Sequence, residues 1–239
     1  MNMKQTKTFL IIPGNPPASY FYQKWCDELA LTYPQYTFKT IPYPRFNTNH
    51  SDKYFSDIIE YYKDIIHTQF KNHQIALIGH SIGGYFSTEI LNRIPDQIEK
   101  CYLIFPFFGQ AKLRGKYLLK LISTIDQTSI LQKQFLKHKN LLGKIWKDLN
   151  FISHEELLAS TRLAHHEKIH LQEFKKPLLD ISHHHKLHLV YNHKDTWCPL
   201  NSVEKLQQMM NVTYIDSDHD FIVAPNQREQ MTKLMGKFF

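Results

Sequence analysis

Short apolar runs rich in β-branched and aromatic residues recur along the chain, separated by longer stretches whose apolar positions have helical spacing. The short runs are typical of strands buried on both faces, and the longer stretches are typical of helices packed on a sheet. We therefore predict strands at Thr8–Ile12, Tyr36–Ile41, Gln74–Ile78, Tyr102–Phe105, Leu187–Tyr191 and Val212–Ile215. Helices are predicted at Ser19–Leu31, from an N-cap at Ser51 to Phe70, and at Ile82–Arg93, Pro199–Met210 and Asn226–Phe238.

The regular alternation of strands and helices predicts an α/β fold with a mostly parallel sheet covered by helices on both faces. The alternation stops between Phe107 and Asp180, where the spacing is helical throughout and no strand stands out. We therefore predict one domain over residues 1–239, with a helical cap at 107–180 inserted between two strands of the sheet.

A serine lies between the third predicted strand and the helix that follows it. The sequence there is Gly79-His80-Ser81-Ile82-Gly83, a GxSxG motif. Such a turn holds its central residue in a strained backbone conformation, and glycines two positions away avoid collisions with neighbouring backbone. Ser81 is the candidate nucleophile, and Gly79 and Gly83 are the residues that the turn requires. The alternative is a glycine-rich turn without chemistry.

A serine nucleophile needs a base, and the base needs an acid that orients it. In this type of sheet the order along the chain is serine, acid, histidine, and each lies just past the carboxyl end of a strand. Asp195 follows the strand at Leu187–Tyr191, and His219 follows the last strand. Alternatively, Asp195 is a turn or helix-cap residue and His219 a surface histidine. The acids at 216, 218 and 220 are too close in sequence to His219 to orient it, but they are candidates for raising its basicity.

Backbone N–H groups near the serine are candidates for an oxyanion hole. The Ile82 N–H lies at the start of the helix after Ser81, and the loop after the first strand supplies Gly14 and Asn15. Gly14 lets that loop turn beneath the site, and the Asn15 N–H is the second predicted donor. Proline has no N–H, so the two prolines that follow are excluded. The aromatic residues at 20–22 either line an acyl pocket or belong to the helix core.

The histidines and cysteines do not predict a metal site. His166 and His170 have helical i,i+4 spacing, but no third ligand is evident. The three cysteines are far apart and include no CxxC pair, which favours a reducing compartment over a disulfide framework. We predict neither a metal nor an organic cofactor.

Two motifs together resemble the lipid droplet-associated hydrolase family, a branch of the α/β-hydrolase superfamily. They are Ile12-Pro13-Gly14-Asn15-Pro16, with Phe21-Tyr22 shortly after, and Leu77-Ile78-Gly79-His80-Ser81-Ile82-Gly83. The resemblance extends from about Phe9 to the C-terminus and is weakest in the cap. It implies an α/β-hydrolase fold and a serine hydrolase acting on ester lipids of the acylglycerol or sterol ester type, with Ser81, Asp195 and His219 as its triad. Pro17 departs from the family pattern, which usually has glycine at that position.

The net charge of +7 is concentrated in one segment. Residues 107–150 contain nine Lys or Arg against two Asp, so this segment accounts for the whole net charge of the chain. The same segment has apolar residues at helical spacing, including Phe135 and Trp146. A basic amphipathic helix of this kind is typical of an element that binds anionic lipid surfaces. The alternative is a cap helix that covers the active site while its lysines face water.

These observations predict a serine ester hydrolase, with a lipid ester as its substrate. The alternatives are a small-ester carboxylesterase, a thioesterase or another Ser-triad hydrolase such as a carbon–carbon bond hydrolase, and a non-catalytic lipid-surface binding protein. No nucleic-acid motif accompanies the basic charge, so we do not expect a nucleic-acid partner. No apolar run is long enough for a signal or transmembrane segment, so we expect a cytoplasmic protein that is soluble or peripheral to a membrane or lipid-droplet surface.

Overall fold

The computed structural model describes residues 7–44, 53–71, 73–108, 151–170, 182–195, 197 and 210–239. The predictions for Ser51, for residues 199–209 and for most of the basic segment 107–150 fall outside the described residues.

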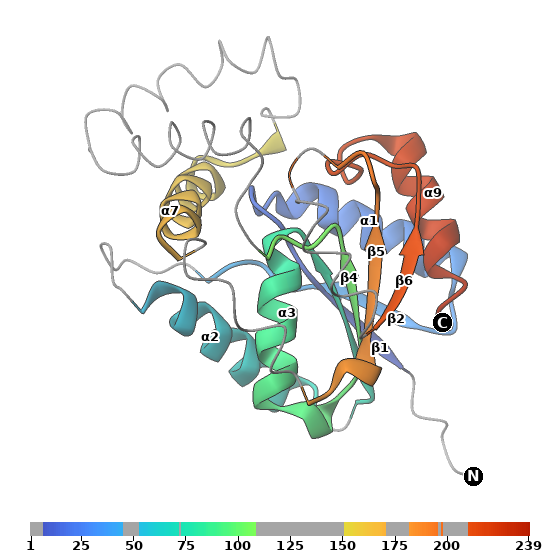
Figure 1. Ribbon diagram of the computed structural model, residues 1–239, viewed down its shortest axis with the longest axis horizontal. Coiled ribbons are helices and arrows are strands. Elements are labelled where there is room, and N and C mark those ends of the chain that lie inside the picture. The colour runs from blue at the N-terminus through green and yellow to red at the C-terminus, as the bar shows by residue number, and fades with distance from the viewer. Residues whose placement is uncertain are drawn as a thin grey trace.

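Within the described residues, six parallel strands form the sheet at the centre of the molecule (Figure 1). Their order is β2-β1-β3-β4-β5-β6, and every neighbouring pair runs in the same direction. The strands are β1 (Thr8–Ile12), β2 (Thr37–Thr40), β3 (Ile75–His80), β4 (Ile98–Ile104), β5 (Leu187–Tyr191) and β6 (Asn211–Tyr214). The predicted parallel sheet is therefore confirmed.

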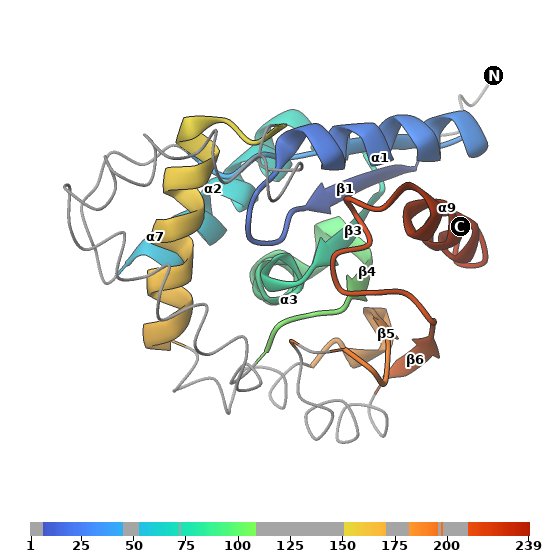
Figure 2. The ribbon, with the colours of Figure 1, turned by 90° about the horizontal axis from the view of Figure 1, so that it is seen from above.

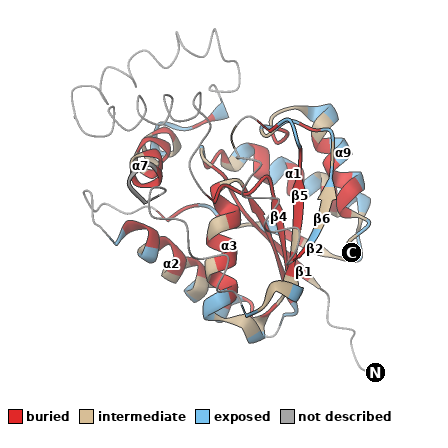
Figure 3. Cartoon of the chain, viewed as in Figure 1, coloured by how far each residue is buried: buried red, intermediate tan, exposed pale blue. Residues whose placement is uncertain are grey.

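Helices cover both faces of this sheet, as Figure 2 shows from above. One face packs against α1 (Ser19–Thr32) and α9 (Pro225–Met235), and the other against α2 (Tyr54–Gln69) and α3 (Ile82–Arg93). Alternate residues of each strand supply the two cores. Phe9 and Ile11 belong to the first core, and Leu10 and Ile12 belong to the second. The inner strands are consequently buried along almost their whole length (Figure 3).

Several boundaries differ from the predicted ones. Strand β3 continues for two residues past the predicted end, through Gly79 and His80. Strand β4 begins at Ile98, because its first residues pair with β3 although Glu99 and Lys100 interrupt the apolar run. Helix α2 begins at Tyr54, its first core-facing residue, and Lys53 holds the N-cap position. Two 3-10 turns, Pro95–Gln97 and His184–Lys186, precede β4 and β5.

Helix α7 (His154–His170) is the main described part of the predicted cap. It lies above the carboxyl ends of the strands, next to α2 (Figures 1 and 2). The N–H groups of Ser19 and Ser153 both donate to the Glu156 carboxylate at 2.8 Å, which links the start of α7 to the start of α1. Among the described residues, no helix combines the length and the apolarity that crossing a lipid bilayer requires.

Candidate active site

Ser81 occupies the tip of a strained turn between β3 and α3. Its φ of 53° and ψ of −124° lie in a region that residues with side chains rarely adopt. A Cβ atom on Gly79 would lie 2.5 Å from the Gly83 carbonyl oxygen, and one on Gly83 would lie 2.2 Å from the Ile12 carbonyl oxygen. Both glycines therefore occupy positions where a side chain does not fit, as the motif predicts.

A chain of hydrogen bonds joins Ser81 to His219 and Asp195. The distance from His219 Nε2 to Ser81 Oγ is 2.9 Å, and that from His219 Nδ1 to Asp195 Oδ2 is also 2.9 Å. The Asp195 side chain is 1% exposed and that of His219 is 13% exposed. An ionised aspartate can only accept, so Nδ1 carries the proton and Nε2 is left to accept from the serine hydroxyl. This arrangement can withdraw a proton from Ser81.

Contacts between neighbouring loops hold Asp195 in place. The Trp197 N–H donates to Asp195 Oδ1 at 2.7 Å. The Asn192 side chain donates to the Ser217 carbonyl oxygen at 2.7 Å, joining the loop after β5 to the loop after β6. Asp195 and His219 thus approach each other on two loops that are tied together.

Two of the three other acids near His219 have partners elsewhere. Asp216 lies 3.2 Å from the Lys194 ammonium, and Asp218 accepts from the Gln227 side-chain amide at 2.7 Å. Asp216, Asp218 and Asp220 are all exposed. The role of these three acids in raising the basicity of His219 stays a prediction.

The loop after β1 passes directly over Ser81. A Cβ on Gly14 would lie 3.0 Å from Ser81 Cβ. The Gly14 N–H is already engaged, because it donates to the Tyr22 hydroxyl at 2.7 Å. Ile82 begins α3 and is fully buried. The oxyanion roles of the Asn15 and Ile82 N–H groups remain predictions.

Helix α7 holds the side chain of Asn15 through hydrogen bonds. The Ser160 hydroxyl donates to Asn15 Oδ1 at 2.5 Å, and Asn15 Nδ2 donates to the Ser160 carbonyl oxygen at 3.3 Å. Asn15 Nδ2 also lies 3.4 Å from Glu167 Oε1. Glu167 is 3% exposed, and burial raises the pKa of its carboxyl to about 8, although the contact with Asn15 opposes this shift. A neutral carboxyl therefore supports the loop at pH 7.

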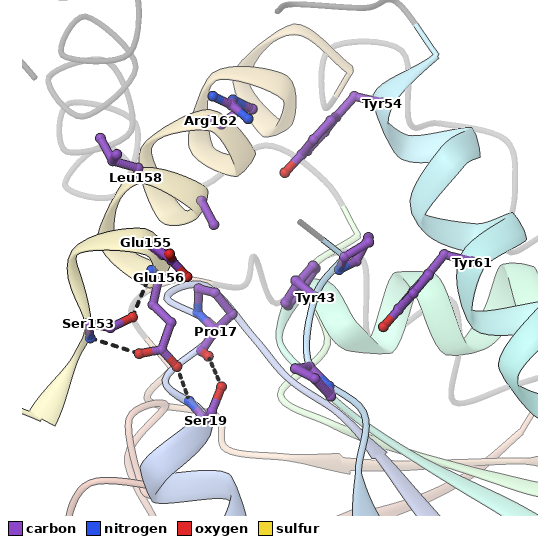
Figure 4. A pocket seen from close by; sticks show the side chains of 13 residues that line it. Pro17, Ser19, Tyr43, Tyr54, Tyr61, Ser153, Glu155, Glu156, Leu158 and Arg162 are labelled. Atoms are coloured by element: carbon purple, nitrogen blue, oxygen red, sulfur yellow. Dashed lines mark hydrogen bonds between the residues drawn. The ribbon is translucent and has the colours of Figure 1, made fainter. Parts of the chain in front are cut away.

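A cavity of about 760 Å³ opens between α2, α7 and the segment 42–44 (Figure 4). Tyrosine rings and prolines line much of it, and Glu155, Glu156 and Arg162 add charge from α7. Pro17 is part of its wall, only two residues beyond Asn15. The lining residues are Pro17, Ser19, Pro42, Tyr43, Pro44, Tyr54, Tyr61, Ser153, Glu155, Glu156, Leu158, Ala159 and Arg162.

The aromatic residues at the start of α1 divide between several roles. Tyr22 and Phe21 are buried in the core, whereas Tyr20 is 47% exposed and stacks on Phe151 at 4.8 Å between ring centroids. Neither Tyr20, Phe21 nor Tyr22 belongs to the lining of the 760 Å³ cavity. The helix-core alternative therefore describes Phe21 and Tyr22.

His166 packs within the protein. Its ring is 3% exposed and stacks on Tyr54 at 4.4 Å between centroids. Within the described part of the chain, no three His, Cys, Asp or Glu side chains come together as metal ligands would.

Sequence reasoning gave no role to Ser160 and Glu167, which support Asn15 from α7. His80 lies inside the motif, where its position favours a structural role, but its buried hydrogen bond with Tyr22 is not foreseen. These contacts span 58 to 152 residues, which no local pattern reveals.

Comparisons with known proteins agree with this fold. The sequence model of the lipid-droplet associated hydrolase family matches residues 5–154. The lipid droplet-associated hydrolase of Homo sapiens is 30% identical over 127 residues, which span 44% of this chain and 39% of the human protein. The chain thus matches well under half of the length of that relative.

Solved structures of α/β-hydrolases superpose on nearly the whole chain. An esterase from Exiguobacterium antarcticum is 16% identical with a TM-score of 0.65, covering 98% of this chain and 92% of the esterase. A haloalkane dehalogenase from Agrobacterium tumefaciens is 12% identical with a TM-score of 0.71, covering 98% and 90%. Identities this low establish the fold alone. The match of the family model to more than half of the sequence, on a chain with the α/β-hydrolase fold, shows that the chain belongs to the lipid droplet-associated hydrolase family.

Proposed function

We propose that this protein is a serine ester hydrolase in which Ser81, His219 and Asp195 form the catalytic triad. The observation that carries the proposal is the continuous hydrogen-bond chain from Ser81 Oγ through His219 to Asp195, with Ser81 held on a strained turn. Serine, base and orienting acid in this geometry are the arrangement that nucleophilic acyl transfer requires.

In the proposed acylation step, Ser81 Oγ attacks the ester carbonyl carbon while His219 Nε2 takes the hydroxyl proton. Asp195 stabilises the imidazolium that results. The carbonyl oxygen becomes an oxyanion, and the N–H groups of Asn15 and Ile82 would donate to it. When the tetrahedral intermediate collapses, the C–O bond to the alcohol breaks and His219 returns its proton to the departing alkoxide.

Deacylation reverses these roles with water as the nucleophile. His219 removes a proton from water, whose oxygen attacks the acyl-enzyme carbonyl. Collapse of the second intermediate breaks the bond to Ser81 Oγ, and His219 protonates the serine. The products are a carboxylic acid and an alcohol, and no external oxidant or reductant is required.

We propose a lipid ester of the acylglycerol or sterol ester type as the substrate class. Membership of the lipid droplet-associated hydrolase family supports this choice. Helix α7 would belong to a cap over residues 107–180 within a single domain. Small esters, thioesters and carbon–carbon bond substrates suit the same triad, and a panel of esters graded by chain length discriminates among them.

Labelling with a fluorophosphonate probe tests the catalytic proposal, because the probe reacts only with an activated serine. We expect the wild type to be labelled and Ser81→Ala to be inert. Ser56→Ala, which removes an exposed serine hydroxyl on α2 outside the cavity lining, is the matched control and should label normally. A folded wild type that resists the probe, or Ser81→Ala labelled as strongly as the wild type, would sink the catalytic proposal in favour of a non-catalytic lipid-surface binding protein.

We also propose that the protein acts while docked on an anionic lipid surface, such as that of a membrane or lipid droplet. Tyr20 and Phe151 support this proposal: they are 47% and 50% exposed and stack on each other. In the sequence, Phe151 directly follows the basic segment 107–150, most of which lies outside the described residues. Exposed aromatic rings beside basic residues suit the boundary between lipid headgroups and acyl chains.

Co-sedimentation with anionic and neutral vesicles tests this docking. We expect salt-sensitive binding to anionic vesicles that weakens in the Tyr20→Ser/Phe151→Ser variant. Leu31→Ser is the matched control, because Leu31 is 86% exposed at the opposite end of α1. Equal binding to both kinds of vesicle, or no effect of the double substitution, would contradict docking through this pair.

A further inference from the structure

A buried chain of hydrogen bonds links three parts of the candidate site without including Ser81. The Gly14 N–H donates to the Tyr22 hydroxyl oxygen at 2.7 Å, and the Tyr22 hydroxyl lies 2.5 Å from His80 Nδ1. His80 Nε2 lies 2.8 Å from the backbone carbonyl oxygen of His219. Tyr22 and His80 are 1% and 4% exposed. These hydrogen bonds therefore connect the loop after β1, through Tyr22 and His80, to the loop that carries His219.

Only one placement of hydrogens satisfies every member of this chain. The His219 carbonyl can only accept, so His80 Nε2 carries a proton, and a neutral imidazole then leaves Nδ1 as an acceptor. The Gly14 N–H can only donate, so the Tyr22 oxygen accepts from it and directs its own hydrogen to His80 Nδ1. Burial, and secondarily the nearby charge of His219, lowers the pKa of His80 to about 3. His80 thus keeps this neutral form at any pH near neutrality.

Closely packed neighbours restrict the movement of these hydrogen-bonded groups. A Cβ on Gly14 would lie 3.1 Å from the Tyr22 hydroxyl and 3.2 Å from His80 Nδ1. The His80 ring contacts Phe221 at 5.0 Å and the His219 ring at 5.3 Å between centroids. Removing one member would leave buried polar groups unpaired in a tightly packed place, where each such group has a high energetic cost.

We propose that Tyr22 and His80 are positioning residues that set the distance between the oxyanion loop, Ser81 and His219. His80 directly precedes Ser81, so it anchors the His219 backbone to the same strand end that carries the nucleophile. The Tyr22 hydroxyl connects the loop that contains Gly14 to His80. The proposal rests on the proposed function, since it assigns Tyr22 and His80 to the support of that same triad.

Three substitutions test the two ends of the hydrogen-bond chain Gly14–Tyr22–His80–His219, called the relay below, one at a time. Tyr22→Phe removes the hydroxyl that Gly14 and His80 share. His80→Asn keeps a polar atom near Nδ1 but cannot reach the His219 carbonyl, whereas His80→Gln carries an amide N–H far enough to donate to it. Tyr102→Phe is the matched control, because it deletes another buried tyrosine hydroxyl. That hydroxyl donates to the Phe238 carbonyl oxygen at 2.9 Å.

The readouts are kcat and KM for p-nitrophenyl butyrate and the rate of fluorophosphonate labelling, at a temperature where each variant is folded by circular dichroism. We expect Tyr22→Phe and His80→Asn to lower kcat and the labelling rate by about 10- to 100-fold while KM changes by less than about threefold, as a displaced catalytic group does. His80→Gln should recover much of the loss, and Tyr102→Phe should match the wild type.

The two proposals fail in different ways. An inert wild type would overturn the proposed function and the relay with it. An active wild type whose kcat is unchanged in Tyr22→Phe and His80→Asn would overturn the relay alone. The relay would also be overturned if KM rather than kcat changed, or if His80→Gln were as impaired as His80→Asn.

Discussion

Gly83 shows how closely the backbone around Ser81 is packed. A Cβ at this position would lie 2.2 Å from the Ile12 carbonyl oxygen and 2.4 Å from that of Pro13, and neither backbone atom can move without shifting β1. We therefore expect Gly83→Ala to lower the free energy of unfolding by more than about 3 kcal/mol, measured by urea denaturation.

Gly14→Ala provides the comparison for that substitution. Its Cβ would approach mainly side-chain atoms, at 3.0 to 3.2 Å, which a small rearrangement relieves. We expect it to cost clearly less stability than Gly83→Ala. Equal losses for the two variants would show that backbone crowding at Gly83 is not the determining factor.

Glu167 makes the stability of the protein depend on pH. The pKa of its carboxyl rises from 4.5 to about 8 in the folded state because the group is buried. Between these two values the folded protein retains a proton that the unfolded chain has lost. Stability from this group is therefore fully present below pH 4.5 and falls as the pH rises toward 8, with a limiting slope of about 1.4 kcal/mol per pH unit.

Glu167→Gln tests this dependence, because the amide cannot ionise but its oxygen can still accept from Asn15. We expect unfolding free energies measured between pH 5 and 8 to fall less steeply in this variant than in the wild type. Glu155→Gln on the same helix, where the side chain is exposed, is the control. Identical slopes for the wild type and Glu167→Gln would refute the assignment.

At the scale of elements, α7 and the loop after β1 act as one unit. Asn15 exchanges two hydrogen bonds with Ser160, so the conformation of the predicted oxyanion loop depends on the position of the helix. We expect Asn15→Ala and Ser160→Ala each to lower kcat by about 3- to 10-fold through displacement of that loop. The double variant should lose little more than Asn15→Ala, since both changes remove the same contact.

Thr161→Val is the control for this pair. Thr161 is buried one position further along α7, and its hydroxyl donates only within the helix, to the Leu158 carbonyl oxygen at 2.9 Å. We expect its kcat to equal that of the wild type. Additive losses in Asn15→Ala/Ser160→Ala would show that the two residues act independently of each other.

The sequence pattern predicted the bounds of an element best where the element is apolar along its whole length and packs in the core. The strands Thr8–Ile12 and Leu187–Tyr191 and the helix Ile82–Arg93 have the predicted bounds. The pattern missed the first residues of β4, because Glu99 and Lys100 sit at the amino end of the sheet, where polar side chains reach solvent.

The candidate site was predictable only in part. Ser81 lies in a local motif, and the order of residues along this type of sheet pointed to Asp195 and His219. By contrast, the contact between Tyr22 and His80 spans 58 residues and exists only once α1 has packed on the sheet. Such contacts follow from tertiary structure and leave no spacing that a single sequence reveals.

At the scale of the whole molecule, Arg228 joins the last helix to the first. The residue is 1% exposed, and its guanidinium makes two hydrogen bonds of 2.8 Å to the Glu28 carboxylate, with a third of 2.9 Å to the Ile222 carbonyl oxygen. Because Arg228→Met leaves the carboxylate and the carbonyl without this partner, we expect it to cost about 2–4 kcal/mol in urea denaturation.

Lys233→Met is the matched control on the same helix. Lys233 pairs with Glu229, but both side chains are more than half exposed, so solvent screens the pair and it contributes little to stability. We expect the stability of this variant to stay near that of the wild type. A similar small effect for Arg228→Met would mean that the packing of α9 does not depend on the ion pair.

The distance along the chain between Ser81 and His219 has a consequence for synthesis on the ribosome. These residues are 138 positions apart, and the loop that carries His219 follows β6, which pairs with β5 at the edge of the sheet. A nascent chain would therefore display the serine long before its partner emerges from the exit tunnel. With Ser81, His219 and Asp195 as the triad, Ser81 of a nascent chain should react with an active-site probe only after β6 has paired with the sheet.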